Sequence, residues 1–135
     1  MLFDSDVVID VLAQRQPFFP TSVLALNTVA QGRVEGYVSG HAVTNIFYIL
    51  RRQLGSETTR ELLTRLLLKL KVASVTDAVV RQALSSPITD FEDAVTSAAA
   101  IASGVELIVT RNTSDFQSSP VEAMSPDMFL TTLSL

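Results

Sequence analysis

Hydrophobic and polar positions along the chain form two kinds of pattern: short apolar runs, and longer segments with helical spacing. The short runs predict β-strands at residues 2–3, 34–39, 72–75, 107–110 and 121–124. The longer segments predict helices at residues 4–14, 21–31, 40–53, 56–70, 76–86, 91–103 and 126–133. Because strands and helices alternate, this order favours right-handed crossovers and a parallel sheet with helices on both faces.

Polar residues, glycine and proline mark the expected ends of the helices. The segment 16–20 contains two prolines and is expected to separate the first two helices, so that the second begins with Thr21 or Ser22 as its cap. Asp90 is the expected cap of the alanine-rich helix, and Gly104 is expected to end it. Thr76 is expected to open the helix that follows the third strand. Ser125 is the expected cap of the last helix, and Pro126 suits its first position.

Composition indicates a globular protein. The chain has 135 residues, of which 47% are hydrophobic, and this predicts one domain over residues 1–135. It contains no cysteine, which is compatible with a reducing compartment, and a cytoplasmic location is expected. The first ten residues lack the basic segment of a signal peptide, and no apolar run is long enough to span a membrane.

The distribution of charge is more informative than its sum. The formal net charge of −4 argues against a polyanionic partner. Residues 51–81, however, contain seven basic and three acidic side chains, so this segment is +4 and the rest of the chain is −8. A basic segment beside acidic ones suits a polyanion held near a metal centre. An ordinary solvated helix face explains the same basic segment equally well.

Acidic and amide side chains lie where predicted strands end or helices begin. They are Asp4 and Asp6, Asp90 and Asp93, and Asn112 and Asp115. In a parallel α/β sheet the carboxyl ends of the strands border one crevice, so these three groups are expected to share a site. Crowded carboxylates need protons or a cation to coexist. Oxygen ligands without nearby Cys or His favour Mg²⁺ or Mn²⁺, which predicts a metal-dependent phosphodiester enzyme.

Each acidic group taken alone also has a structural interpretation. The acids at the first helix start can act as caps, and Asn112 with Asp115 can form a turn that bonds its own backbone. Asp10 lies further along its helix, and we expect it to be exposed or to lie behind the site. His41 is the only histidine and is expected at the surface or as a cap, which leaves a Ser-His-Asp triad poorly supported.

Four segments resemble the PIN-domain ribonucleases. They are LFDSDVVIDVL at the start, VSGHAVTNIFYIL in the middle, ITDFEDAVTSAAAIASGVELIVTRNTSDF in the second half, and SPDMFL near the end. Within that family the sequence is most similar to the VapC-type bacterial toxins. The resemblance implies a three-layer α/β/α sandwich around a central, mainly parallel sheet of four or five strands. It also implies Mg²⁺- or Mn²⁺-dependent cleavage of RNA.

The resemblance assigns roles to individual residues. Catalytic and metal-binding acids are expected at Asp4, Asp93 and Asp115. Further metal ligands are expected at Asn112 and at Asn45, where the family usually has Glu. The secondary positions are Asp6, Asp90 and Thr110, and the residues expected to contact RNA phosphates are Arg111, Arg51 and Arg52. The implied partners are RNA, a small antitoxin protein and a second copy of the chain, without a membrane.

Two other functions remain open on the sequence. Asn45 in place of the usual Glu fits a weak or inactive PIN scaffold that binds RNA or protein. Asp4-Ser5-Asp6-Val7-Val8 also fits the start of haloacid-dehalogenase-type phosphatases, in which Asp4 would be a nucleophile. That chemistry and the related receiver domains need a later lysine, and the only lysines here are Lys69 and Lys71.

Overall fold

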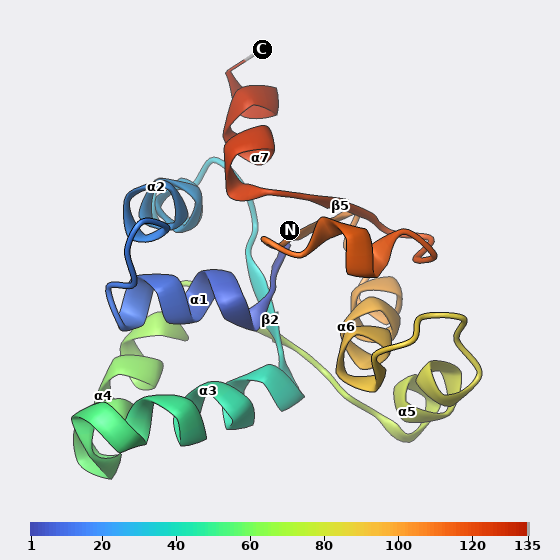
Figure 1. The fold of residues 1–135 in the computed structure, drawn as a ribbon, viewed down its shortest axis with the longest axis horizontal. Coiled ribbons are helices and arrows are strands. Elements are labelled where there is room, and N and C mark those ends of the chain that lie inside the picture. Colours follow the sequence, from blue (N-terminus) through green and yellow to red (C-terminus); the bar gives the residue numbers. More distant parts are fainter. Residues whose placement is uncertain (135) are drawn as a thin grey trace.

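A five-stranded sheet, parallel throughout, forms the centre of the computed structural model, which describes residues 1–134 (Figure 1). The strands are β1 (Leu2–Phe3), β2 (Tyr37–Ser39), β3 (Lys71–Ala73), β4 (Leu107–Val109) and β5 (Glu122–Met124). Their order across the sheet is β3-β2-β1-β4-β5. The expected α/β/α sandwich with a parallel sheet is therefore confirmed, with five strands.

Helices cover both faces of this sheet. They are α1 (Ser5–Leu12), α2 (Phe19–Ala30), α3 (Gly40–Leu54), α4 (Ser56–Leu66), α5 (Asp77–Leu84), α6 (Phe91–Ala102) and α7 (Pro126–Leu133), with a 3₁₀ helix η1 (Thr113–Phe116). Helices α1 to α4 and α7 lie on one side, and α5 and α6 lie on the other (Figure 1). No helix within residues 1–134 is long and apolar enough to cross a membrane.

Successive residues of the short strands point into two separate hydrophobic cores. Phe3 is fully buried in the core under α1 to α4 and α7, where its ring meets Phe129 edge-on at 6.1 Å. Leu2 points the other way, into the core under α5 and α6, as does Ile108 of β4. Successive side chains along a strand point to opposite faces of the sheet. Because helices cover both faces, both sets of side chains are buried, and the strands appear in the sequence as continuous apolar runs.

Several helix ends agree with the sequence, and others differ from it. Asp90, Thr76 and Ser125 cap their helices through side-chain hydrogen bonds to backbone N–H groups. Helix α2, however, begins at Phe19 because Pro20 fits its first turn, so the expected start after residue 20 was wrong. Helix α4 ends at Leu66, four residues before the expected end, since the chain turns there to enter β3.

The strand order reverses between β1 and β4, and this reversal defines the functional edge of the sheet. From β1 the chain moves outward through β2 to β3, then returns to β4 on the other side of β1 and continues to β5. Phe3 is in register with Val109, so Asp4 and Thr110 leave the sheet side by side. A crevice at the carboxyl ends of strands beside such a switch point is the usual ligand site of open α/β sheets.

Candidate functional site

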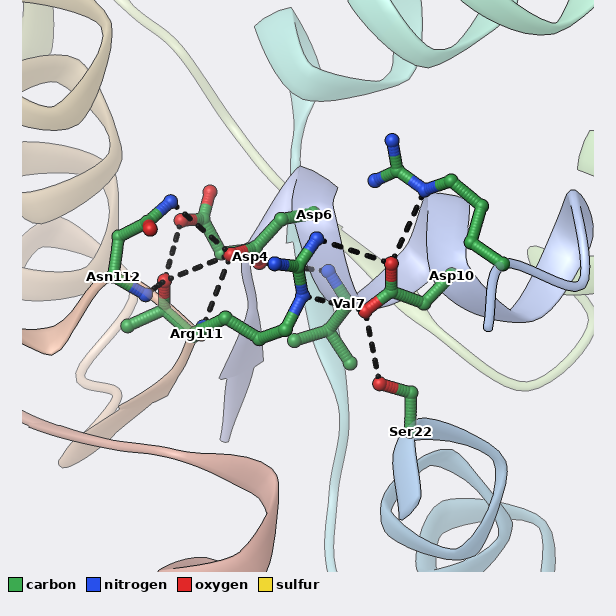
Figure 2. A network of polar contacts seen from close by, with 9 residues as sticks. Asp4, Asp6, Val7, Asp10, Ser22, Arg111 and Asn112 are labelled. Carbon is green, nitrogen blue, oxygen red and sulfur yellow. Dashed lines mark hydrogen bonds and ion pairs between the residues drawn. The ribbon is translucent and has the colours of Figure 1, made fainter. Parts of the chain in front are cut away.

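Asp4 is held at the end of β1 by contacts with β4. Its backbone N–H donates to the Val109 carbonyl at 2.9 Å. Its Oδ1 accepts from the Ser5 N–H at 2.8 Å, which caps α1, and its Oδ2 accepts from the Thr110 hydroxyl at 2.9 Å. Asp4 is only 7% exposed and Thr110 is fully buried. The carboxylate is therefore fixed at the ends of β1 and β4, and Figure 2 shows Asp4 within this polar network.

Asp6 is surrounded by the loop that follows β4. Its Oδ2 accepts from the Arg111 backbone N–H at 3.0 Å and from the Asn112 side-chain amide at 3.3 Å (Figure 2). The backbone N–H of Asn112 in turn donates to the Thr110 hydroxyl at 3.0 Å. The residues at the start of α1 and the residues after β4, which are more than a hundred positions apart in sequence, thus form one hydrogen-bonded group.

Asp93 and Asp115 approach this group from the other side of the sheet. Asp93 lies in the first turn of α6, where its N–H donates to the capping Asp90 at 3.0 Å, and Asp115 lies in η1. Burial, followed by the charges of Asp90 and Asp115, raises the pKa of Asp93 to about 6. The charge of Asp6 also contributes to this shift.

The pKa of Asp4 is raised more than that of Asp93. Burial, followed by the charge of Asp6, raises the pKa of Asp4 to about 7, and the charge of Asp93 raises it further, while the hydrogen bond from Thr110 opposes the shift. Burial also raises the pKa of Asp6. Carboxylates from α1, α6 and η1 therefore repel one another in one place, and added positive charge would relieve this repulsion.

The side chains of this group are of the types that bind a hard divalent cation, but they are not arranged around a single point. The group consists of carboxylate, amide and hydroxyl oxygens, which are the ligands of Mg²⁺ and Mn²⁺. Within residues 1–134, however, no three His, Cys, Asp or Glu side chains are arranged closely enough to hold a metal ion. Asp4 and Asp6 instead accept the hydrogen bonds described above. Coordination by the expected set therefore requires some of these side chains to turn.

Asn45 lies in the second turn of α3, which begins directly after β2. It is half-buried and has no hydrogen bond with the carboxylates among the residues that the structure describes. His41, one turn earlier, is half-buried, with Nδ1 3.0 Å from the Ser39 hydroxyl and Nε2 3.4 Å from the Thr96 hydroxyl. Burial lowers the pKa of His41. It joins the start of α3 to α6, a link that its place in the sequence did not indicate.

Asp10 is fully buried, so the alternative in which it is exposed was wrong. Its carboxylate accepts from Arg111 Nε at 2.8 Å and Nη2 at 3.1 Å, from Arg15 Nε at 3.2 Å, and from the Ser22 hydroxyl at 3.2 Å. The Arg111 guanidinium also lies 3.8 Å from the centre of the Phe18 ring. An acid within an otherwise apolar helix was the available signal that a buried partner exists.

The three arginines expected to contact RNA have different positions. Arg111 is beside the acids, but two of its nitrogens are bound to Asp10. Arg51 and Arg52 are exposed in the last turn of α3, and Arg51 lies over the Tyr48 ring at 4.9 Å. At 1.5 Å per helical residue they are roughly 17 Å along α3 from its start at Gly40. Their contact with RNA phosphates remains a prediction.

Comparison with known proteins agrees with this architecture. A family model described as PIN domain matches residues 1–114. No curated protein sequence matches the chain. A toxin–antitoxin complex from Klebsiella pneumoniae contains a chain with 19% identity and a TM-score of 0.71, covering 93% of this chain and 96% of that one.

Two further solved structures are similar at low sequence identity. The FitAcB structure from Neisseria gonorrhoeae has 19% identity and a TM-score of 0.69, covering 93% of this chain and 96% of that one. VapC20 of Mycobacterium tuberculosis, described as a toxin that cleaves the sarcin–ricin loop, has 17% identity and a TM-score of 0.62, covering 79% of this chain and 85% of that one. These likenesses show the shared fold, and the family model, which matches most of the residues, shows that the chain belongs to the PIN domain family.

Proposed function

We propose that this protein is a metal-dependent endoribonuclease and the toxin of a toxin–antitoxin pair. The observation that carries the proposal is the electrostatic coupling of Asp4 and Asp93 at the strand switch point. Burial and neighbouring carboxylates raise the pKa of Asp4 to about 7 and that of Asp93 to about 6. Carboxylates so placed are stabilised by a divalent cation, and perturbed acids in a crevice are typical of functional sites.

The proposed ligands for Mg²⁺ or Mn²⁺ are Asp4, Asp93 and Asp115, with the neutral oxygens of Asn112 and Asn45. When bound, the metal supplies an activated water and stabilises the charge on the leaving oxygen of the phosphodiester. Neutral amides add less to cation affinity than carboxylates do, so we expect weaker metal binding than in a site with Glu at position 45.

The surrounding residues position the acids. Thr110 donates to Asp4 at 2.9 Å and so fixes the direction of that carboxylate. The Arg111 N–H holds Asp6 at 3.0 Å, while the Arg111 side chain is anchored on Asp10. Asp90 caps α6 and holds the turn that carries Asp93. In this arrangement Arg111 orients the site, and we propose no direct contact between its guanidinium and RNA phosphate.

RNA and an antitoxin are the proposed partners. Basic side chains predominate in residues 51–81, which include the end of α3, all of α4 and the first five residues of α5. Most of these basic side chains are exposed, which suits a polyanion. The similar VapC20 is described as cleaving an RNA loop, and other similar structures are toxin–antitoxin complexes. We extend both properties to this chain as part of the proposal, together with a homodimer. A molecular mass by light scattering equal to that of the monomer would contradict the homodimer.

Cleavage of a fluorescent single-stranded RNA tests the enzymatic proposal. The wild type, Asp4→Asn and Asp93→Asn are compared with Mn²⁺, Mg²⁺ or EDTA. We expect cleavage by the wild type that EDTA abolishes, and loss of cleavage in both variants. Asp77→Asn is the matched control, because Asp77 is an exposed acid in the first turn of α5, and its activity should equal that of the wild type. Full activity of Asp4→Asn would contradict the assignment.

A binding scaffold without catalysis is the second candidate. The observations that favour it are the neutral Asn45 and the lack of a preformed metal-binding cluster within residues 1–134. Fluorescence anisotropy with the same RNA separates the two candidates. Tight RNA binding by folded, partner-free protein without cleavage in Mn²⁺ would favour the scaffold.

The phosphotransfer alternative is not supported by the site geometry. Lys69 is exposed in the turn between α4 and β3. Lys71 opens β3 at the opposite end of the sheet from Asp4 and pairs with Glu35 at 2.7 Å. No lysine therefore stands where a phosphoaspartate would need one.

A further inference from the structure

A cavity lies beside the acidic group, between the loop before α6 and η1. It measures about 520 Å³ and is lined by residues 87–90 and by Ser114, Asp115, Gln117 and Ser118. This volume falls within the range of about 300–1,000 Å³ that is usual for small-molecule sites. Asp115, a proposed metal ligand, and Asp90, the cap of α6, belong to both the cavity wall and the acidic group.

The chemistry of the wall does not suit a phosphate. Among the residues that line the cavity, the only charged side chains are the acids Asp90 and Asp115. Two carboxylates repel an anion. An ionised carboxylate can only accept hydrogen bonds, so a suitable ligand is uncharged or cationic and offers N–H or O–H donors.

The same wall has the features of a nucleobase site. Pro87 is exposed and supplies an apolar surface on which a flat ring can pack, to which the 8%-exposed Ile88 adds little. Gln117 is exposed and its side-chain amide has no hydrogen bond to another described residue, so it can offer a donor and an acceptor together. Single-stranded RNA bases are usually recognised by packing on one face and hydrogen bonds along an edge.

We propose that this cavity binds one nucleobase of the RNA next to the cleaved phosphate, and that it favours bases with an exocyclic amino group over uracil. The inference rests on the proposed ribonuclease function. Adenine and cytosine present an amino donor at the position where uracil presents a carbonyl oxygen, and guanine presents an amino donor at its 2-position. The carboxylate and amide oxygens of the cavity wall can accept a hydrogen bond from any of these amino groups. Gln117 is the residue that we assign to reading this edge.

Cleavage kinetics test the preference. We compare kcat/KM for RNA oligonucleotides that differ only in the nucleotide on one side, and then on the other side, of the scissile phosphate. For one of these positions the wild type should prefer amino-bearing bases to uracil by about fivefold or more. Gln117→Ala should reduce that ratio to below about twofold. Gln31→Ala, which removes an exposed glutamine at the end of α2, should keep the wild-type ratio. An unchanged ratio in Gln117→Ala, or no preference in the wild type, overturns the proposal.

A binding measurement keeps this proposal separate from catalysis. Cytidine and uridine differ at the 4-position, where one has an amino group and the other a carbonyl oxygen. In ¹⁵N-labelled wild-type protein, titration with cytidine should shift the Gln117 side-chain amide resonances, and the same concentration of uridine should shift them much less. Equal shifts with both nucleosides, or no shift with either, overturn the nucleobase site. Absence of RNA cleavage alongside a cytidine-specific shift would reject the ribonuclease and retain the binding site.

Discussion

Asp10 and Arg111, which are 101 positions apart in sequence, form a two-point ion pair with distances of 2.8 and 3.1 Å. The backbone N–H of the same arginine donates to Asp6 at 3.0 Å. One residue therefore links the buried middle of α1 to the loop after β4 and to the acidic group. We infer that this pair sets the position of the loop, because its planar guanidinium restricts both distance and angle.

The first prediction concerns the stability that this pair provides. Asp10→Asn should lower the free energy of unfolding by about 3 kcal/mol, because it leaves Arg111 with a neutral partner in a largely buried place. Asp77→Asn is the control, since it removes an exposed pair with Arg81 and should change stability by less than about 1 kcal/mol. Urea unfolding followed by circular dichroism measures both values. Equal, small losses in the two variants would argue against a structural role for Asp10.

The second prediction concerns pH in the absence of metal. Burial and the charge of Asp6 raise the pKa of Asp4 from 3.8 to about 7. Between these values the folded protein keeps a proton that the unfolded chain has lost, so stability falls as pH rises through this range. The loss is about 3–4 kcal/mol for Asp4. Unfolding in EDTA between pH 4 and pH 8 should show a steeper fall for the wild type than for Asp4→Asn.

Added Mn²⁺ should oppose this loss at pH 8. A cation that binds only the folded protein raises the free energy of unfolding by RT ln(1 + c/Kd), where c is its free concentration, so the gain grows with the logarithm of its concentration above the dissociation constant. The wild type should gain stability on addition of Mn²⁺, whereas Asp4→Asn should gain little. Identical gains in the two proteins would show that the cation binds elsewhere.

The third prediction concerns the hydroxyl of Thr110. Thr110→Val keeps the shape of this fully buried side chain but removes its hydrogen bond to Asp4. Stability should fall by about 1–2 kcal/mol, and the pKa of Asp4 should rise further, because that hydrogen bond lowers it. NMR titration of the Asp4 carboxyl carbon measures the second effect. Thr64→Val is the control, because Thr64 is exposed on α4, and it should leave the pKa of Asp4 unchanged. A pKa of Asp4 in Thr110→Val equal to that of the wild type would contradict the role proposed for the Thr110 hydrogen bond.

The fourth prediction concerns the neutral residue on α3. If Asn45 faces the metal as proposed, Asn45→Glu should tighten Mn²⁺ binding about tenfold, because a carboxylate adds charge to the ligand set. Isothermal titration calorimetry gives the dissociation constants. Asn27→Glu, at an exposed position on α2, is the control for added negative charge. Equal affinity in Asn45→Glu and the wild type would remove residue 45 from the proposed ligands.

Local patterns in the sequence account for most of the fold. The caps Asp90, Thr76 and Ser125 and the positive-φ Gly104 were each identified from neighbouring residues, because capping depends on the few residues around it. The start of α2 at Phe19 was missed, because a proline can either end a helix or occupy its first turn. The sequence alone does not distinguish these two uses.

The candidate site was likewise predicted from the sequence only in part. Strand ends placed Asp4, Asp6 and Asn112 on one edge, and the structure brings these three together. The ion pair of Asp10 with Arg111 was not foreseen, since it depends on how far α1 lies from the loop after β4 and on which way each side chain points. The cavity beside Gln117 likewise arises from two loops that meet only in the folded chain.

The most direct test of the central claim is the single-turnover rate of RNA cleavage as Mn²⁺ is titrated, in the wild type and in Asp93→Asn. Our account predicts a wild-type rate that rises to saturation with Mn²⁺, and a variant rate at least about 100-fold lower at every concentration, because the variant loses a charged metal ligand. Equal rates for the two proteins, or a wild-type rate that does not depend on Mn²⁺, would contradict it.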